Sequence, residues 1–148
     1  MSALRRATAE DFDAVVALQR AAYAKNRPLL GIEPLPLLAD YAQVFSDYEI
    51  WLAESDAGLD GVLVLEPRPD DLLIWSVATA PATQGRGVGN ALLGFAETRA
   101  RELGRSCIRL YTGQPLVSNI AWYQRRGYVQ ESTEDLGDRV IVNLIKQL

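Results

Sequence analysis

Apolar residues recur at intervals of three and four along three segments of the chain, which is the spacing of a helix that buries one face. The first segment covers residues 12–23 and ends before Asn26-Arg27-Pro28, with Thr8 placed to cap the chain ahead of it. The other two predicted helices span residues 88–103 and about 118–126, and a glycine follows each of them as a stop signal.

Short runs rich in β-branched and aromatic residues fill much of the remaining sequence. The run at 72–79 is apolar, as is typical of a central strand buried on both faces. Three prolines and a glycine between residues 28 and 36 favour an irregular loop, and a short helix is predicted at 37–45. Strands are predicted just after Leu4 and at 49–54, 61–65, 72–79, 107–111, 128–132 and 140–145.

The order of these elements predicts an α/β protein of the α+β type, with a mixed sheet and helices on both of its faces. The chain has 148 residues, of which 49% are hydrophobic and 23% charged. These values are ordinary for one compact domain with its own core, so a single domain over residues 1–148 is expected.

Charge and residue usage exclude several classes of site. The net charge is −4 and no cluster of basic and aromatic residues appears, which argues against a nucleic-acid partner. The chain has no histidine and one cysteine, Cys107, so neither a Cys/His metal set, nor a histidine triad, nor an internal disulfide is expected. No apolar run approaches the roughly 20 residues that span a membrane, and Met1 to Arg6 lack the apolar stretch of a secretory signal. A cytoplasmic protein is therefore expected.

The segment Gln84-Gly85-Arg86-Gly87-Val88-Gly89 follows the buried strand at 72–79 and opens the second long helix. Free backbone N–H groups and the positive end of the helix dipole make such a position suitable for phosphate oxygens. Gly87 and Gly89 omit β-carbons that would keep an anion away, and Arg86 can add a charged contact. The interpretation that competes with a pyrophosphate site is a tight turn without a ligand.

Other phosphate-binding motifs fit the loop less well. No Lys-Ser or Lys-Thr follows the last glycine, so the segment is not a P-loop. The third glycine of a dinucleotide-binding fingerprint is replaced by Asn90 or Leu92, depending on the alignment, and no acidic ribose ligand follows at the expected distance. A nucleotide-binding fold remains a weaker alternative.

The loop resembles that of the GNAT superfamily of acetyltransferases, whose pattern Gln/Arg-x-x-Gly-x-Gly/Ala is matched by Gln84, Gly87 and Gly89. The later segment Asn119-x-x-x-Tyr123-x-x-x-Gly127-Tyr128 is similar to a second motif of that superfamily, and residues 4–11 look like its usual opening. The resemblance implies the GNAT fold, with a mostly antiparallel mixed sheet of about six to seven strands and about four helices on both faces.

The resemblance also implies an N-acetyltransferase that moves an acetyl group from acetyl-CoA to a primary amine by direct attack in a ternary complex. Two central strands would separate to admit the pantetheine arm of the co-substrate, and the N–H of Val77 would donate to the thioester oxygen. Tyr123 would be the general acid that protonates the departing sulfur. The residues implied in binding acetyl-CoA are Val77, Ala78, Thr79, Gln84, Gly85, Arg86, Gly87, Val88, Gly89, Asn90, Asn119 and Tyr123.

Structural roles compete with several of these functional ones. Tyr123 also fits a half-buried aromatic residue on an amphipathic helix, Asn119 also fits a helix N-cap, and Cys107 fits a small buried hydrophobic residue. Relatives in a similar subgroup often carry an acidic residue where this chain has Trp75, which either lines an apolar acceptor pocket or packs in the core.

No general base is therefore assigned. The carboxylates near the predicted acceptor loops are expected to be solvated surface charges; they are Glu33, Glu66, Asp70 and Asp71. The alternative function is an acyl-CoA-binding or sensing module that has lost transfer activity. A homodimer is possible through pairing of the apolar final strand.

Overall fold

The structure is a computed structural model that describes residues 4–148. Met1 to Ala3, part of the leading segment considered for a secretory signal, lie outside the described residues. The elements in chain order are β1 (Arg5–Arg6), η1 (Ala9–Asp11), α1 (Phe12–Ala24), α2 (Arg27–Leu30), α3 (Leu35–Leu38), α4 (Tyr41–Asp47), β2 (Glu49–Ser55), β3 (Gly58–Pro67), β4 (Leu72–Thr79), η2 (Pro81–Thr83), α5 (Val88–Glu102), β5 (Cys107–Gly113), α6 (Val117–Gln124), β6 (Val129–Asp135) and β7 (Val140–Gln147).

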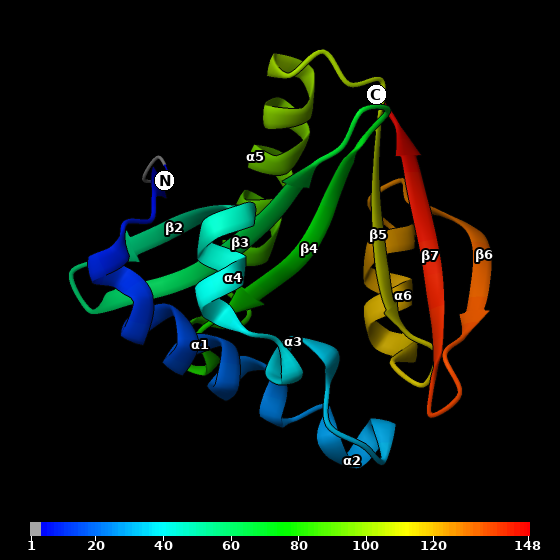
Figure 1. The fold of residues 1–148 in the computed structure, drawn as a ribbon, viewed down its shortest axis with the longest axis horizontal. Helices are drawn as coiled ribbons and strands as arrows, with labels where there is room; N and C mark the ends of the chain where they lie inside the picture. Colours follow the sequence, from blue (N-terminus) through cyan, green and yellow to red (C-terminus); the bar gives the residue numbers. More distant parts are fainter. Residues whose placement is uncertain (1–3) are drawn as a thin grey trace.

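The strands within residues 4–148 form one seven-stranded sheet in the order β1-β2-β3-β4-β5-β7-β6, with β4 and β5 as its parallel pair. Helices α1 and α4 lie in front of the sheet in Figure 1, and α5 lies behind it. One buried cluster joins the sheet to α1 and α4, and another joins it to α5. The expected mixed, mostly antiparallel sheet with helices on both faces is confirmed, and single-turn helices α2 and α3 add to the expected number.

The segment between α1 and β2 differs from the prediction. The expected irregular loop at 28–36 contains the single-turn helix α2, because Pro28 sits at the first turn, where a fixed φ and a missing N–H are tolerated. The single helix predicted at 37–45 is wrong, because Asp40 divides it into α3 and α4. The side chain of Asp40 accepts a hydrogen bond from the N–H of Ala42 at 3.0 Å, which caps α4.

The centre of the sheet opens along β4. Strands β4 and β5 pair only from Leu72 to Ile74, and Figure 1 shows them diverging beyond that point. Just after this pairing ends, the register with β3 shifts by one residue, so that Trp75 is the extra residue of a β-bulge. Trp75 and Ser76 consequently both face α1 and α4. The bulge and the divergence place a gap in the middle of the fold.

The final strand does not have the free edge that was expected to pair with a second subunit. β7 lies between β5 and β6, so both of its edges are already hydrogen-bonded and the prediction of a free apolar final strand is wrong. The edge strand at this end of the sheet is β6, which is exposed along its whole length. No helix in the described part of the chain is long and apolar enough to cross a membrane.

Candidate active site

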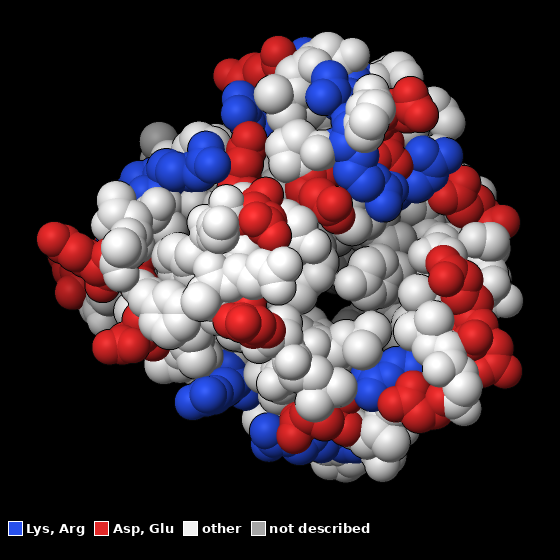
Figure 2. Space-filling view, in the orientation of Figure 1, with Lys and Arg blue, Asp and Glu red and all other residues white. Residues whose placement is uncertain are grey.

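Two cavities meet at the gap between β4 and β5. The larger, of about 410 Å³, extends along the glycine loop, and the smaller, of about 100 Å³, lies under α2 and α3. A hollow is visible at this position in Figure 2, bordered mainly by uncharged side chains. The residues that line both cavities are Tyr23, Asn26, Val77, Asn119 and Tyr123.

The glycine loop presents free backbone amides to the larger cavity. The N–H of Arg86 donates to the carbonyl oxygen of Thr83, and the N–H of Ala91 begins the helical pattern by donating to Gly87. Within the loop and the first turn of α5, the amides that donate to no other described residue include those of Gly85, Gly87, Val88, Gly89 and Asn90. These donors converge at the N-terminus of the 15-residue helix α5, which is the geometry that anion binding requires.

Each glycine of the loop is needed for a different physical reason. Gly85 and Gly87 have φ angles of 84° and 82°, in the left-handed region that side chains with a β-carbon rarely adopt. A β-carbon on Gly87 would meet no described atom within 4 Å, so it would project into open space at the cavity. A β-carbon on Gly89 would lie 3.3 Å from the ring of Trp122, so this glycine lets α5 approach α6.

The backbone of β4 directs polar groups into the gap. The N–H of Ala80 donates to the carbonyl oxygen of Asp60 on β3 at 2.8 Å. Hydrogen-bonded and non-hydrogen-bonded pairs alternate along antiparallel strands, so Val77 and Thr79 turn their N–H and C=O groups away from β3. Because β5 does not pair there, these groups face the larger cavity.

Tyr123 of α6 stands where the two cavities join. Its hydroxyl has no hydrogen-bonding partner in the described part of the chain, so it is free to meet a ligand. Burial, assisted by the neighbouring Tyr23, raises the pKa of Tyr123 above its ordinary value. The phenol therefore keeps its proton at neutral pH, as a general acid must.

The predicted cofactor residues come together, with one exception. The larger cavity is lined by Val77, Ala78, Thr79, Gln84, Gly85, Gly87, Val88, Gly89, Asn90, Asn119 and Tyr123. Arg86 is exposed and does not line it. Asn119 lies inside α6, whose N-cap position is Leu116, so the capping role considered for Asn119 is wrong.

Sequence reasoning missed a cation beside the loop. Arg126 lines the larger cavity, stacks 4.0 Å from the ring centroid of Trp122 and donates to the side chain of Asn90 at the start of α5. Stacking on Trp122 four residues earlier is a helical neighbour contact that the sequence spacing allowed. Arg126 brings a positive charge to the place where the free amides converge.

Sequence reasoning also missed a buried polar network that holds one wall of the gap. Gln19 of α1 is fully buried and donates to Ser76 at 3.0 Å and to Tyr41 at 3.1 Å. The hydroxyls of Tyr23 and Ser76 lie 2.8 Å apart, and Tyr23 also donates to the carbonyl oxygen of Val77. These bonds fix α1 against β4, yet a lone glutamine within an apolar helical pattern gives no such signal.

The smaller cavity is mainly apolar. Its wall includes Trp75, which packs edge-on against Tyr41 and tilted against Tyr48. Trp75 thus takes both roles considered for it, lining the cavity and packing in the core. Other apolar lining residues are Leu30, Leu35, Ile74, Leu116 and Ile141.

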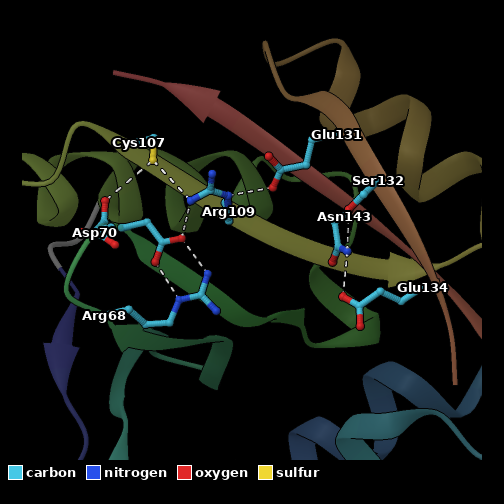
Figure 3. Close-up of polar contacts among 9 residues, drawn as sticks. Arg68, Asp70, Cys107, Arg109, Glu131, Ser132, Glu134 and Asn143 are labelled. Carbon is cyan, nitrogen blue, oxygen red and sulfur yellow. Dashed lines mark hydrogen bonds and ion pairs between the residues drawn. The ribbon is translucent and has the colours of Figure 1, made fainter.

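The four carboxylates considered near the acceptor loops do not line either cavity. Asp71 is 3% exposed, and its carboxylate accepts hydrogen bonds from Arg68 at 2.6 Å and Arg109 at 2.8 Å. Figure 3 shows the side chains of Arg68 and Arg109 close together. The expectation that Asp71 is a solvated surface charge is therefore wrong. Cys107, beside this cluster, is a buried residue as predicted.

Comparison with known proteins agrees with this geometry. The sequence model of a family described as "Acetyltransferase (GNAT) domain" matches residues 46–130, more than half of the chain, including β4, the glycine loop and α6. The chain belongs to the GNAT acetyltransferase family. The general activity of GNAT proteins is acetyl-CoA-dependent N-acetylation.

Individual GNAT relatives match at low identity. The uncharacterized N-acetyltransferase YvbK of Bacillus subtilis (strain 168) is 26% identical over 100 residues, which cover 68% of this chain and 63% of that protein. The match thus spans less than two thirds of that relative's length.

Solved structures show the GNAT fold along the chain. The IAA acetyltransferase from Bacillus cereus ATCC 14579 has a TM-score of 0.74 at 24% identity, with 99% of each chain covered. The PaiA N-acetyltransferase from Thermoplasma acidophilum, in complex with coenzyme A, has a TM-score of 0.79 at 19% identity, with 100% of each chain covered.

Proposed function

We propose that this GNAT protein transfers the acetyl group of acetyl-CoA to a primary amine by direct attack within a ternary complex. The observation that carries the proposal is the meeting of two cavities at Val77, Asn119 and Tyr123. A long donor and a small acceptor can then be bound together, with their reacting atoms side by side in the gap.

Acetyl-CoA fits the larger cavity by its chemistry. The free amides from Gly85 to Asn90 and the nearby Arg126 would hold the pyrophosphate, where the helix dipole of α5 adds to their effect. The outward N–H and C=O groups of Val77 and Thr79 would pair with the amides of the pantetheine arm, as an added strand would. The PaiA N-acetyltransferase structure, determined with coenzyme A, supports this co-substrate.

The proposed reaction needs few protein groups, and its atoms and protons balance. The lone pair of the amine attacks the thioester carbonyl carbon, and the oxygen that gains charge accepts a hydrogen bond from the N–H of Val77. The carbon–sulfur bond then breaks, and Tyr123 gives its proton to the departing thiolate. The nitrogen loses one proton, which restores the phenol. The products are the N-acetylated amine and free coenzyme A.

A binding module without transfer activity is the second candidate. It is favoured by one observation, that no Asp or Glu in the described residues lines either cavity to act as a base. It is opposed by Tyr123, whose free hydroxyl at the junction has no structural partner to explain it.

Thiol release from acetyl-CoA, measured across a panel of primary amines, tests the proposal. Direct attack predicts release that depends on the amine, with initial-rate lines that intersect when both substrates are varied. Parallel lines would indicate an acetylated enzyme instead of a ternary complex. Binding of coenzyme A by calorimetry, with no turnover on any acceptor, would leave only the binding module.

A further inference from the structure

The ionisable side chains that line the two cavities are either cationic or neutral. The chain has no histidine, and no carboxylate within residues 4–148 lines either cavity. Burial raises the pKa of Tyr23 to about 12 and also raises the pKa of Tyr111 and of Tyr123, so these phenols are uncharged at neutral pH. The remaining ionisable lining residues are Lys25, Arg126 and Arg139.

The carboxylates around the smaller cavity do not give it a free negative charge. Asp138 forms an ion pair with Arg139, and Glu33 forms one with Arg27 at 2.6 Å. Glu66 acts on Tyr111 only from a distance, as a minor cause of its raised pKa. An ammonium ion in the cavity would therefore lose its hydration without gaining a counter-charge, which is unfavourable.

The size and lining of the smaller cavity restrict the rest of the acceptor. Its volume is about 100 Å³, well below the roughly 300–1,000 Å³ of clefts that hold drug-sized molecules. An engineered apolar cavity of about 150 Å³ holds benzene, so the space here suits a single ring that reaches partly into the gap. Its wall is formed by Trp75, Leu30, Ile74 and Ile141, together with the ring of Tyr111.

Asn26 supplies a polar contact at the junction. The residue is only 5% exposed and lines both cavities, yet its side-chain amide forms no hydrogen bond with the described residues. It occupies the N-cap position of α2 without making a side-chain capping bond. The amide atoms of Asn26 are not among the fully buried unsatisfied atoms of residues 4–148, so they open onto the cavities and can form hydrogen bonds with a ligand there.

From the charge, size and free amide together we infer that the acceptor is a small, apolar, weakly basic primary amine that enters as the free base and is held through its N–H by the Oδ1 of Asn26. This inference rests on the proposed function and names the substrate class of its acceptor cavity. A free-base amine already carries the lone pair that attacks the thioester. Proton balance then needs only Tyr123, which gives a proton to sulfur and regains the one that nitrogen loses.

The pH dependence of kcat/KM for two amines of nearly equal shape tests the charge state. Phenethylamine and its weakly basic β,β-difluorinated analogue are compared between about pH 6 and 10, with acetyl-CoA saturating. If the free base binds, the midpoint of each profile follows the pKa of the amine and lies lower for the fluorinated one. A common midpoint for both amines would show a titrating base on the protein and would overturn the inference.

Variants of Asn26 test the contact. Asn26→Ala should raise KM for both amines roughly three- to tenfold, because one hydrogen bond is lost, and this change should exceed any change in the Kd for coenzyme A. Asn26→Asp keeps the shape but adds the missing anion, so it should strengthen binding of the phenethylammonium ion to the coenzyme A complex by about tenfold. Leu29→Ala, at a neighbouring residue that is 62% exposed, is the control. Unchanged amine constants in both Asn26 variants would overturn the contact.

The set of amines that the protein acetylates also separates this inference from the proposed function. Acetylation of spermidine or of a lysine peptide, with neither phenethylamine accepted, would overturn the acceptor class and leave acetyl transfer standing. Binding of coenzyme A with no turnover on any amine would overturn the proposed function, and the inference with it.

Discussion

At the scale of single residues, the hydroxyl of Tyr123 is the group most closely tied to the proposed chemistry. Tyr123→Phe removes the proposed acid and little else, because that hydroxyl bonds to no described residue. We expect kcat to fall by about 10²-fold or more, with the Kd for acetyl-CoA nearly unchanged. Equal losses in affinity and rate would instead assign Tyr123 to binding.

Tyr128 provides a matched comparison five residues later. Its ring is buried, with 1% of the residue exposed, and its hydroxyl has no hydrogen-bonding partner in the described structure. An unsatisfied buried hydroxyl costs about 1–3 kcal/mol, so Tyr128→Phe should raise the free energy of unfolding by about 1 kcal/mol and leave the rate intact. Urea denaturation measures this, and a clear loss of stability would mean that the hydroxyl is satisfied in solution.

How well single residues could be predicted depends on whether their role is local. The loop glycines and Tyr123 belong to short motifs, so the sequence indicated their positions. Asn26 and Gln19 gain their roles only when α1 packs on β4, and no local pattern reports that contact. For Trp75, the bulge in β4 decides that the side chain faces the smaller cavity, and sequence periodicity does not show the bulge.

At the scale of elements, α5 and the loop before it carry two glycines with opposite expected behaviour. Gly87→Val places a branched side chain at φ 82° and at the cavity, so binding of coenzyme A should be abolished. Gly94 lies inside α5, and a β-carbon added there would meet nothing within 4 Å, so Gly94→Ala should stabilise the protein by about 0.5–1 kcal/mol. Calorimetry with coenzyme A checks the first variant, and thermal denaturation checks the second. Tight binding of coenzyme A by Gly87→Val would refute the proposed pyrophosphate site at the glycine loop.

Long periodic elements could be located from the sequence, whereas short ones could not. The strand at 72–79 and helices α1 and α5 show a clear apolar period and defined ends, and the structure places them within about a residue of the prediction. Between α1 and β2 the helices are only four to seven residues long. Their limits depend on caps such as Asp40 and on packing over the gap, which outweigh periodicity.

At the scale of the whole molecule, Asp71 links the turn between β3 and β4, which also holds Arg68, to Arg109 on β5. The hydrogen bond from Arg68, followed by that from Arg109, lowers the pKa of Asp71. A carboxylate whose pKa is lowered by folding stabilises the protein above its unfolded pKa of about 3.9, and this contribution is lost as the pH falls below that value.

Replacement of Asp71 tests this linkage. Asp71→Asn should cost about 2–3 kcal/mol of unfolding free energy at pH 7, because it leaves two arginines without their buried partner. The difference from the unmodified protein should narrow as the pH falls below about 4. Glu131→Gln, which removes a more exposed partner of Arg109, should cost less than about 1 kcal/mol. A difference that stays constant with pH would show that the charge of Asp71 is not the cause.

The overall architecture followed from the order of elements and the family resemblance, but the separation of β4 from β5 was implied by the resemblance alone. No residue pattern in the sequence predicts that two strands pair over three positions and then separate. The proposed function depends on that gap, because the two cavities join there.

A crystal structure of the protein with coenzyme A tests this account most directly. It should show the pyrophosphate accepting hydrogen bonds from amides between Gly85 and Asn90, the pantetheine arm along Val77 and Thr79, and the sulfur beside the hydroxyl of Tyr123. A ligand bound elsewhere, with those amides engaged by the protein itself, would contradict the account.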